Sequence, residues 1–350
     1  MLATLIYNER DIRVEEVADP KLSTGLDAIV RVVAACVCGS DLWPYRGVVP
    51  TRHPHRIGHE FIGVVEQVGD EVDKVRPGDF VIAPFYVCCG ICVNCRNGVS
   101  TSCLNGGWWG EDDKRGAFAD GGQGERVRVP LADGTLFPLD DQPDEALIPS
   151  LLTLSDVMGT GHHAAVSAGV TPGSTVAVVG DGAVGLCAII ASKRLGAARI
   201  IAMSRHADRQ ALAREFGATD IVEERGDEGV AAVRALSEGG VGADFVLECV
   251  GTKESMDQAL RSTRPGGMVG YVGAPNGGPE LPVRPMFNRN VGVNGGVAPV
   301  RGYMAELLPD ILSGAIDPGR VFDLELPLAD AAEAYAAMDE RRATKVLLRP

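Results

Sequence analysis

Short alternating runs of hydrophobic and polar residues dominate the first 150 positions of the chain. Three examples are 28–36 (AIVRVVAAC), 63–69 (GVVEQVG) and 126–130 (RVRVP), and turn signals such as RPGD at 76–79 separate them. Runs of this kind, rich in β-branched residues and bounded by glycine and proline, are typical of short β-strands. The pattern predicts a barrel-like β domain whose loops carry polar groups.

The pattern changes after about residue 155, where short apolar strands alternate with longer helical stretches. Strand-like segments lie at 175–180, 199–204, 220–224, 243–250 and 268–274, and helix-like runs lie at 183–196 and 209–218. This alternation indicates right-handed βαβ units around a parallel sheet. From about residue 298 the pattern returns to that of the first region and ends in a strand-like segment. The sequence therefore predicts an α/β fold with two domains, one formed by 1–154 and 296–350 and the other by 155–295.

Composition and charge narrow the possible partners. Of the 350 residues, 45% are hydrophobic and 23% are charged, as in an ordinary globular enzyme, and the formal net charge is -14. An acidic surface repels phosphate backbones and anionic lipids, so we expect neither a nucleic-acid partner nor a membrane partner. An anionic cofactor stays possible, because it needs only a local positive pocket.

The distribution of apolar residues and cysteines bears on location. The first residues lack the basic region and apolar run of a secretory signal, and the sequence has no apolar stretch of 18 residues. We therefore expect a cytoplasmic location. Nine cysteines are present, and in a reducing compartment clustered cysteines bind metal more often than they form disulfides.

A glycine-rich turn opens the second domain. Residues 180–185 have the pattern G-x-G-x-x-G and lie between a predicted strand and a predicted helix; they are Gly180, Asp181, Gly182, Ala183, Val184 and Gly185. In that context the glycines allow a tight turn, a close approach of a pyrophosphate and close packing of helix on strand, and the helix N-terminus offers amide donors. The pattern predicts a dinucleotide site, with an ordinary glycine-rich βα turn as the alternative.

The end of the next strand bears on which dinucleotide binds. An NAD site usually has an acidic residue there, which accepts from the ribose hydroxyls. This strand ends instead in Ser204 and Arg205, and Arg209 follows one helical turn later. A hydroxyl and a guanidinium fork suit a 2′-phosphate, which favours NADP(H) over NAD(H). Alternatively, Arg205 is a solvated surface charge and NAD is used.

Four closely spaced cysteines form the strongest single pattern; they are Cys89, Cys92, Cys95 and Cys103. Four thiolates in such a short segment can enclose one Zn²⁺ in a tetrahedral structural site that has no open position for chemistry. An iron–sulfur cluster and disulfide pairing are alternatives. The neighbouring Cys88 is a spare thiol, and an exchange of register between Cys88 and Cys89 is possible.

A second group of metal-ligand residues lies in the first domain. Cys38 and His59 are about 20 residues apart, and a thiolate and a neutral imidazole are good zinc ligands. A catalytic zinc needs a third protein ligand and one position open to substrate or water. Spacing alone does not identify that third ligand.

Taken together, these features resemble the zinc-containing medium-chain dehydrogenase/reductase superfamily over essentially the whole chain. The matching segments are CGSD at 38–41, GHE at 58–60, RPGD at 76–79, the cysteine segment 89–103, the glycine-rich turn 180–185 and the pair Lys345-Val346. The resemblance implies a GroES-like β-barrel catalytic domain with an inserted Rossmann domain. It further implies that Cys38 and His59 bind a catalytic zinc, beside which Glu60 exchanges with water.

The resemblance also suggests the remaining site residues. Asp156 stands where the bacterial secondary-alcohol branch has its third zinc ligand, although an aspartate there can instead cap the following helix. The Ser204-Arg205 pair resembles the NADP-using members of that branch. The positions that match the nicotinamide surroundings are Thr160, Val250, Gly251, Val272 and Gly273.

The implied activity is the interconversion of an alcohol and its aldehyde or ketone with NADP(H), with two zinc ions per chain. Ser40 matches the hydroxyl that relays the alkoxide proton. Many relatives carry a histidine three residues later, where this chain has Trp43, which cannot act as a base. The outer relay then passes to the cofactor ribose, to water or to another group, with His53 and His55 as candidates by their position in the sequence.

Three tryptophans are candidates for the walls of the substrate pocket. We expect Trp43 to shape the substrate pocket, and Trp108 and Trp109 either line that pocket or pack in the core.

One alternative function is an NAD(H)-using polyol, sugar or amino-alcohol dehydrogenase. Another is a non-catalytic zinc-bearing dinucleotide-binding protein. The resemblance also implies a homodimer or homotetramer acting on a small-molecule alcohol or carbonyl.

Overall fold

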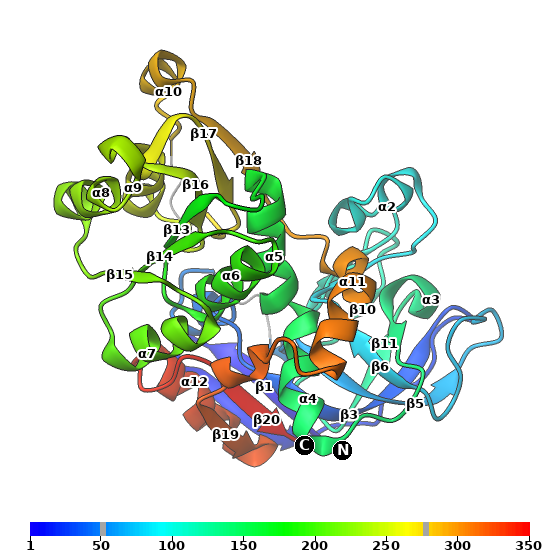
Figure 1. Ribbon diagram of the computed structural model, residues 1–350. Helices are drawn as coiled ribbons and strands as arrows, with labels where there is room; N and C mark the ends of the chain where they lie inside the picture. Colours follow the sequence, from blue (N-terminus) through cyan, green and yellow to red (C-terminus); the bar gives the residue numbers. More distant parts are fainter. Residues whose placement is uncertain (50–53, 276–279) are drawn as a thin grey trace. The chain divides into compact units, whose positions relative to one another are not determined.

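The computed structural model describes residues 1–49, 54–275 and 280–350 (Figure 1). The chain divides into two compact units, and we call them the metal unit and the dinucleotide unit. The metal unit comprises Met1–Asp156 and Pro299–Pro350, and the dinucleotide unit comprises Val157–Ala298. The boundaries predicted from the sequence, at 154/155 and 295/296, lie two and three residues away.

The metal unit is mostly β-structure. Its strands are β1 (Leu2–Asn8), β2 (Asp11–Glu16), β3 (Ala28–Cys36), β4 (His55–Arg56), β5 (Phe61–Val68), β6 (Phe80–Ala83), β7 (Tyr86–Val87), β8 (Gly107–Trp108), β9 (Glu111–Asp112), β10 (Phe118–Ala119), β11 (Arg126–Val129), β12 (Phe137–Pro138), β19 (Leu324–Pro327) and β20 (Val346–Arg349). Seven of them form one sheet in the order β12-β6-β5-β3-β20-β19, with β11 also paired to β3.

Strand β3 organises this sheet. Its residues, AIVRVVAAC, are almost all buried. This pattern is typical of a strand that is covered on both faces. It pairs antiparallel with β5, β11 and β20, so a segment near the end of the chain completes a sheet begun by its first residues. The residues just after β3 and just before β5 include Cys38 and His59, and the adjacent pairing of these two strands brings them together.

Short helices connect and cover the sheets of the metal unit. They are α1 (Leu42–Tyr45), α2 (Val93–Arg96), α3 (Ala132–Thr135), α4 (Ile148–Leu152), α11 (Val300–Leu312), α12 (Ala331–Asp339) and the 3₁₀ turns η1 (Ser100–Ser102), η2 (Glu145–Leu147), η3 (Thr153–Ser155), η5 (Pro318–Val321) and η6 (Leu328–Asp330). The 13-residue α11 is a departure from the sequence analysis, which expected the region after 298 to resemble the β-rich start of the chain.

The dinucleotide unit is a parallel six-stranded sheet. Its strands are β13 (Thr175–Val179), β14 (Arg199–Met203), β15 (Asp220–Val222), β16 (Ala243–Glu248), β17 (Thr263–Tyr271) and β18 (Gly292–Gly295), in the order β15-β14-β13-β16-β17-β18. The order reverses between β13 and β16. In open sheets of this kind, ligands bind outside the carboxyl ends of the strands at that reversal.

Helices cover both faces of the parallel sheet; they are α5 (Val157–Ala168), α6 (Ala183–Arg194), α7 (Ala207–Phe216), α8 (Gly226–Ala235), η4 (Glu238–Gly240), α9 (Lys253–Ser262) and α10 (Val283–Arg289). Helix α5 packs on α6, and α8 packs on α9 on the other side of the strands (Figure 1). Helix α7 begins two residues before the predicted run at 209–218.

The confirmed fold is thus a GroES-like β-rich domain with a Rossmann domain inserted in its sequence. None of the helices in the described ranges combines the length and the apolar character needed to cross a bilayer.

Candidate metal and cofactor sites

Four potential metal ligands converge in the metal unit. One donor atom each from Cys38, His59, Glu60 and Asp156 lies within 4.8 Å of the others. The Cys38 Sγ is 3.6 Å from Asp156 Oδ2, and the same oxygen is 3.8 Å from His59 Nε2. Asp156 follows η3 at the end of the first segment of the metal unit, far along the sequence from Cys38. The third ligand suggested by resemblance is therefore placed with the other two.

Asp41 orients the histidine of this group. Its Oδ1 lies 3.1 Å from His59 Nδ1, which leaves Nε2 on the side of the other donors. Its Oδ2 accepts a 2.9 Å hydrogen bond from the backbone N–H of Cys38. Metal-binding histidines usually have their second nitrogen held in this way, which fixes both tautomer and ring orientation. Although burial acts to lower it, the pKa of His59 is raised well above its ordinary value by Asp41 and Cys38.

A buried lysine pairs with one carboxylate oxygen of Glu60. Lys345 Nζ lies 2.7 Å from Glu60 Oε1 and also donates to the backbone carbonyl of Val37 at 3.3 Å. Both side chains are essentially inaccessible to solvent. The other oxygen, Oε2, is buried and has no hydrogen-bond partner within the described residues. Burial raises the pKa of Glu60 and Lys345 opposes this effect. Glu60 thus has one oxygen fixed and one left for a cation.

A hydroxyl and an aromatic pair lie beside the donors. Ser40 Oγ donates to Cys38 Sγ at 3.3 Å. The Phe85 ring meets the His59 ring edge-on at 6.4 Å between centroids, and Trp108, 37% exposed, stacks on Phe85 at 6.1 Å. Trp109 is different, since it is buried, donates to the Pro84 carbonyl and belongs to the core. Of the two tryptophans that the sequence left undecided, Trp109 therefore packs in the core, whereas Trp108 is partly exposed beside Phe85.

The four-cysteine segment closes on itself around α2. The donor atoms of Cys89, Cys92, Cys95 and Cys103 lie within 4.8 Å of one another, and all four residues are free thiols. Three of the sulfur–sulfur distances are 3.4, 3.5 and 3.9 Å. A tetrahedral zinc with bonds of about 2.3 Å separates its sulfurs by about 3.8 Å. The geometry therefore fits one zinc ion and leaves no position for substrate.

Backbone amides donate hydrogen bonds to two of the sulfurs in this segment. The N–H of Leu104 donates to Cys92 Sγ and that of Asn105 donates to Cys103 Sγ. Hydrogen bonding led by the Leu104 N–H lowers the pKa of Cys92 to about 6. By contrast, Cys88 is buried, donates to the Gly134 carbonyl and has its pKa raised to about 12 by burial. The structure therefore keeps Cys88 outside the cluster, in agreement with the register chosen from the spacing.

The glycine-rich turn lies at the carboxyl end of β13. Gly180 has a φ of +116°, and a Cβ on Gly185 would meet the Gly180 carbonyl oxygen at 2.0 Å, so both positions require glycine. At Gly182, the N-cap of α6, an added Cβ would meet no heavy atom within 4 Å. The backbone there is open to a phosphate, and the α6 amide groups Ala183 and Val184 follow it.

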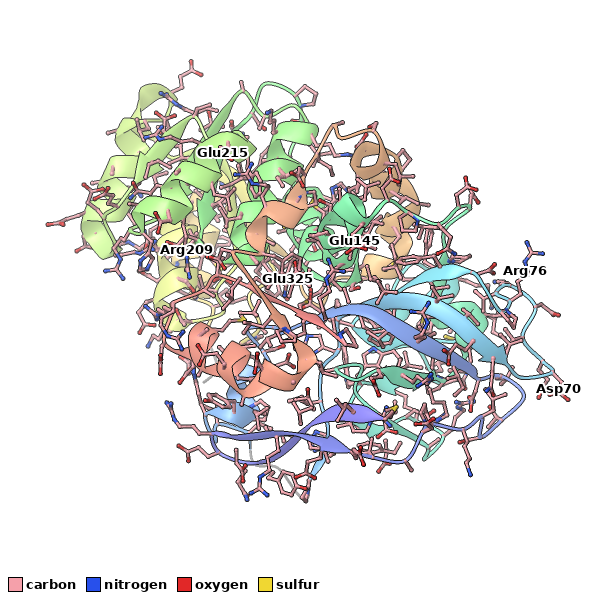
Figure 2. All side chains as sticks on the ribbon, turned by 90° about the horizontal axis from the view of Figure 1, so that it is seen from below. Asp70, Arg76, Glu145, Arg209, Glu215 and Glu325 are labelled. Carbon is pink, nitrogen blue, oxygen red and sulfur yellow. The ribbon has the colours of Figure 1, made fainter. Side chains whose placement is uncertain are left out.

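Cationic side chains gather at the carboxyl ends of β14 and β15. Arg209, in the first turn of α7 and labelled in Figure 2, lies 3.3 Å from Asp181, and Ser204 donates to the same carboxylate at 2.8 Å. Arg225 donates to the Met203 carbonyl. Arg205 is exposed. The predicted Ser204 thus contacts Asp181, and Arg225 contacts the same strand end; the sequence reasoning gave neither Asp181 nor Arg225 a role.

The segments expected to border the nicotinamide also meet. Gly251 and Gly273 follow the adjacent strands β16 and β17, and a Cβ on Gly273 would collide with the Gly251 nitrogen at 2.1 Å. Glu248 accepts from the N–H groups of Val250 and Gly251, and its own carbonyl accepts from Val272 and Gly273. Thr160 is buried in α5. The four loop residues therefore form one surface at the sheet's carboxyl edge.

Known proteins share both halves of this arrangement. The family model "Alcohol dehydrogenase GroES-like domain" matches residues 25–141, and the model "Zinc-binding dehydrogenase" matches 183–313. A probable zinc-binding alcohol dehydrogenase of Mycobacterium tuberculosis is 36% identical over 343 residues, which cover 97% of this chain and 86% of that protein. The chain belongs to the zinc-binding alcohol dehydrogenase family.

Solved structures of the family have the same fold. An alcohol dehydrogenase from Thermus sp. ATN1 has a TM-score of 0.90 and 35% identity, and covers 100% of this chain and 99% of its own. A zinc-binding dehydrogenase from Sinorhizobium meliloti, bound to NADP, has a TM-score of 0.82 and 27% identity, and covers 100% and 99%. The superfamily resemblance is confirmed. As a zinc-binding alcohol dehydrogenase, the chain is an oxidoreductase for small alcohols or carbonyls that uses a nicotinamide cofactor.

Some residues of this family member lie elsewhere than the sequence suggested, or were overlooked. His53 lies outside the described residues. His55, the other candidate for the outer proton relay, packs against Phe118 at 6.2 Å between ring centroids. Asp41 and Phe85 were not assigned roles, and Lys345 was noted only as part of a matching segment. The aspartate three residues after Cys38 was a usable signal for a partner of the histidine, whereas nothing local to the sequence pairs Lys345 with Glu60.

Proposed function

We propose that the chain interconverts an alcohol and its aldehyde or ketone by hydride transfer to or from NADP(H) at a catalytic zinc. The observation that carries this proposal is the convergence of Cys38, His59 and Asp156, with Glu60 tied to Lys345. Thiolate, imidazole and carboxylate are ligands that zinc takes, and three of them leave one position open. When bound, zinc would polarise the substrate oxygen as a Lewis acid, and the nicotinamide would exchange the hydride.

The residues around these ligands have separate tasks in the proposal. Asp41 keeps His59 in the tautomer whose Nε2 is free to bind the ion. Ser40 carries the hydroxyl that accepts and passes on the proton of the substrate alcohol. Phe85 and Trp108 provide an apolar wall for the carbon skeleton of the substrate. Cys89, Cys92, Cys95 and Cys103 hold the second, structural zinc.

The cationic set at β14 and β15 supports the choice of NADP(H). Ser204 and the guanidinium groups of Arg205, Arg209 and Arg225 stand out in a chain whose net charge is -14, and they suit a phosphate dianion. The NADP-bound relative is consistent with this choice.

The experiment that tests the whole proposal is a panel of alcohols and carbonyls assayed with each cofactor, with zinc measured on the same sample. We expect two zincs and turnover with NADP(H); iron or a single zinc would contradict the ligand assignment.

Cofactor preference has its own prediction. The double substitution Ser204→Asp and Arg205→Gln is expected to reverse the preference from NADP(H) to NAD(H), because the carboxylate accepts from the ribose hydroxyls and repels a 2′-phosphate. The measurement is the ratio of kcat/KM for the two cofactors, which should change by roughly a hundredfold, as expected when two phosphate contacts are lost. An unchanged ratio would remove the phosphate-pocket argument.

The natural substrate class is decided by the same panel. Turnover restricted to polyols, sugars or amino alcohols with NAD(H) would favour the first alternative, and binding of cofactor without turnover of any carbonyl would favour a non-catalytic role. A homodimer or homotetramer and a cytoplasmic location stay predictions. Sedimentation of the zinc-loaded protein measures the subunit count directly.

A further inference from the structure

Asp181 occupies the variable position between the first two glycines of the dinucleotide turn, and its side chain does not point freely to solvent. The side chain is 15% exposed. Its Oδ2 accepts from Ser204 Oγ at 2.8 Å, and its Oδ1 lies 3.3 Å from Arg209 Nη1. Both carboxylate oxygens therefore engage groups at the start of the β14–α7 connection.

Ser204 and Arg209 are also donors that a 2′-phosphate would use. Ser204 is fully buried, and Gln210 Nε2 fixes its backbone by donating to its carbonyl at 3.0 Å. The hydroxyl has one proton to donate, and here it goes to Asp181. A 2′-phosphate that binds here must replace Asp181 as the acceptor of the Ser204 hydroxyl and must share Arg209 with Asp181. The phosphate also comes close to the Asp181 carboxylate, which has the same sign of charge.

The charge on Asp181 is secured by its surroundings. Burial acts to raise the pKa of its carboxyl, but the Ser204 hydroxyl and the nearby Arg209, His206 and Arg225 outweigh this and hold the pKa below its ordinary value. Arg225 in turn is anchored by its 3.2 Å hydrogen bond to the Met203 carbonyl. Asp181 is thus an anion at neutral pH in the middle of the cationic set.

We propose that Asp181 is a specificity-determining residue that competes with the 2′-phosphate for Ser204 and Arg209 and thereby lowers the selectivity of the site for NADP(H) over NAD(H). This inference rests on the proposed function, since it assumes that the 2′-phosphate meets these donors. Its consequence is that removing the carboxylate strengthens, rather than weakens, the binding of a phosphorylated ribose. A carboxylate that merely stabilised the turn would have the opposite effect or none.

The test measures binding of 2′,5′-ADP and 5′-AMP, which differ only by the 2′-phosphate, to the full-length protein by calorimetry, which needs neither zinc chemistry nor turnover. The quantity is the selectivity ratio, Kd for 5′-AMP divided by Kd for 2′,5′-ADP. In Asp181→Asn this ratio is expected to rise by roughly three- to tenfold, the effect of one near-surface charge. Asp181→Ala removes the same charge, is tolerated at this loop position by size, and is expected to give the same direction.

Asp244→Asn is the matched control. Asp244 lies in the same unit, near the amino end of β16, where it pairs with Arg264 at 2.6 Å and accepts from the Thr175 N–H at 2.8 Å. Its substitution changes the net charge of the chain by the same amount and also breaks an ion pair. The selectivity ratio of this variant should equal that of the unmodified protein, which separates a local effect from a general one.

A double-mutant cycle with Arg209→Gln tests whether Asp181 acts through its observed partner. Arg209→Gln should weaken 2′,5′-ADP binding, and in that background Asp181→Asn should raise the ratio by less than it does alone. A ratio that stays constant or falls in both Asp181 variants overturns the inference. Failure of the proposed function looks different: the unmodified protein would then bind 5′-AMP at least as tightly as 2′,5′-ADP.

Discussion

Replacing Asp156 by alanine is expected to lower kcat/KM by roughly a thousandfold, the scale of several kcal/mol of Lewis-acid stabilisation. The carboxylate lies 3.6 Å from Cys38 Sγ and 3.8 Å from His59 Nε2, so its loss removes one corner of the donor set. Zinc content should fall from two ions to one, because the four-cysteine segment shares no residue with this group. Steady-state kinetics and metal analysis of one preparation provide both numbers.

Two further variants separate loss of the ligand from general damage. Asp156→Asn keeps the shape of the side chain but removes its charge, and it should show an intermediate zinc affinity. Asp141→Ala removes an exposed carboxylate of the same unit and should leave kinetics and zinc content unchanged. A zinc-replete and active Asp156→Ala enzyme would show that Asp156 serves another purpose, such as capping α5.

Replacing Lys345 by methionine is expected to lower the free energy of unfolding by about 3–5 kcal/mol, the cost of leaving one member of a buried ion pair without its partner. Lys345 Nζ and Glu60 Oε1 are 2.7 Å apart and neither side chain contacts solvent. The remaining Glu60 carboxyl would be desolvated with no compensating charge. Urea unfolding of the metal-free protein, followed by a probe in the metal unit, measures the effect.

The double variant Glu60→Gln with Lys345→Met is the informative comparison. It removes both charges, so most of the lost stability should return, as found for buried ion pairs replaced as a whole. Lys74→Met changes an exposed lysine of the same unit and should alter stability by no more than about 0.5 kcal/mol. If the single and double variants were equally unstable, packing by the lysine stem rather than pairing with Glu60 would be its role.

The sequence predicts best those features whose residues are close together along the chain. The four cysteines span 15 positions, so their spacing alone indicates a closed metal cluster, and the structure places their sulfurs together. The alternation of strands and helices between 175 and 274 likewise reflects local periodicity, and the parallel sheet is present as expected. Helix α11 was not predicted, because the region after 298 as a whole resembles the β-rich first domain in its sequence pattern.

The metal unit's open donor set is a different case. Cys38 and His59 were found by residue type, but Asp156 lies 118 positions from Cys38 and became a candidate only through family resemblance. The Lys345–Glu60 pair spans 285 positions, and it forms because β20 pairs with β3. These two strands lie far apart in the sequence, and local sequence patterns do not predict which distant strands pair.

The cofactor site shows a further limit. The motif G-x-G-x-x-G specifies the backbone through its glycines and treats Asp181 as an arbitrary residue. Only the fold reveals that the turn aims this side chain at Ser204, 23 positions away. Sequence reasoning therefore proposed donors for a 2′-phosphate but gave no role to the carboxylate that already contacts Ser204 and Arg209.

The interrupted layout of the metal unit has a consequence for biosynthesis. The dinucleotide unit is one continuous segment, whereas the metal unit needs β20, which follows that entire segment. Domains fold as they emerge from the ribosome, so the dinucleotide unit is expected to become native while the end of β3 at Ala35 and Cys36 still lacks its partner strand β20 and Glu60 still lacks its ammonium partner. The nascent metal unit is therefore expected to be the part of the chain most exposed to aggregation and to chaperone capture.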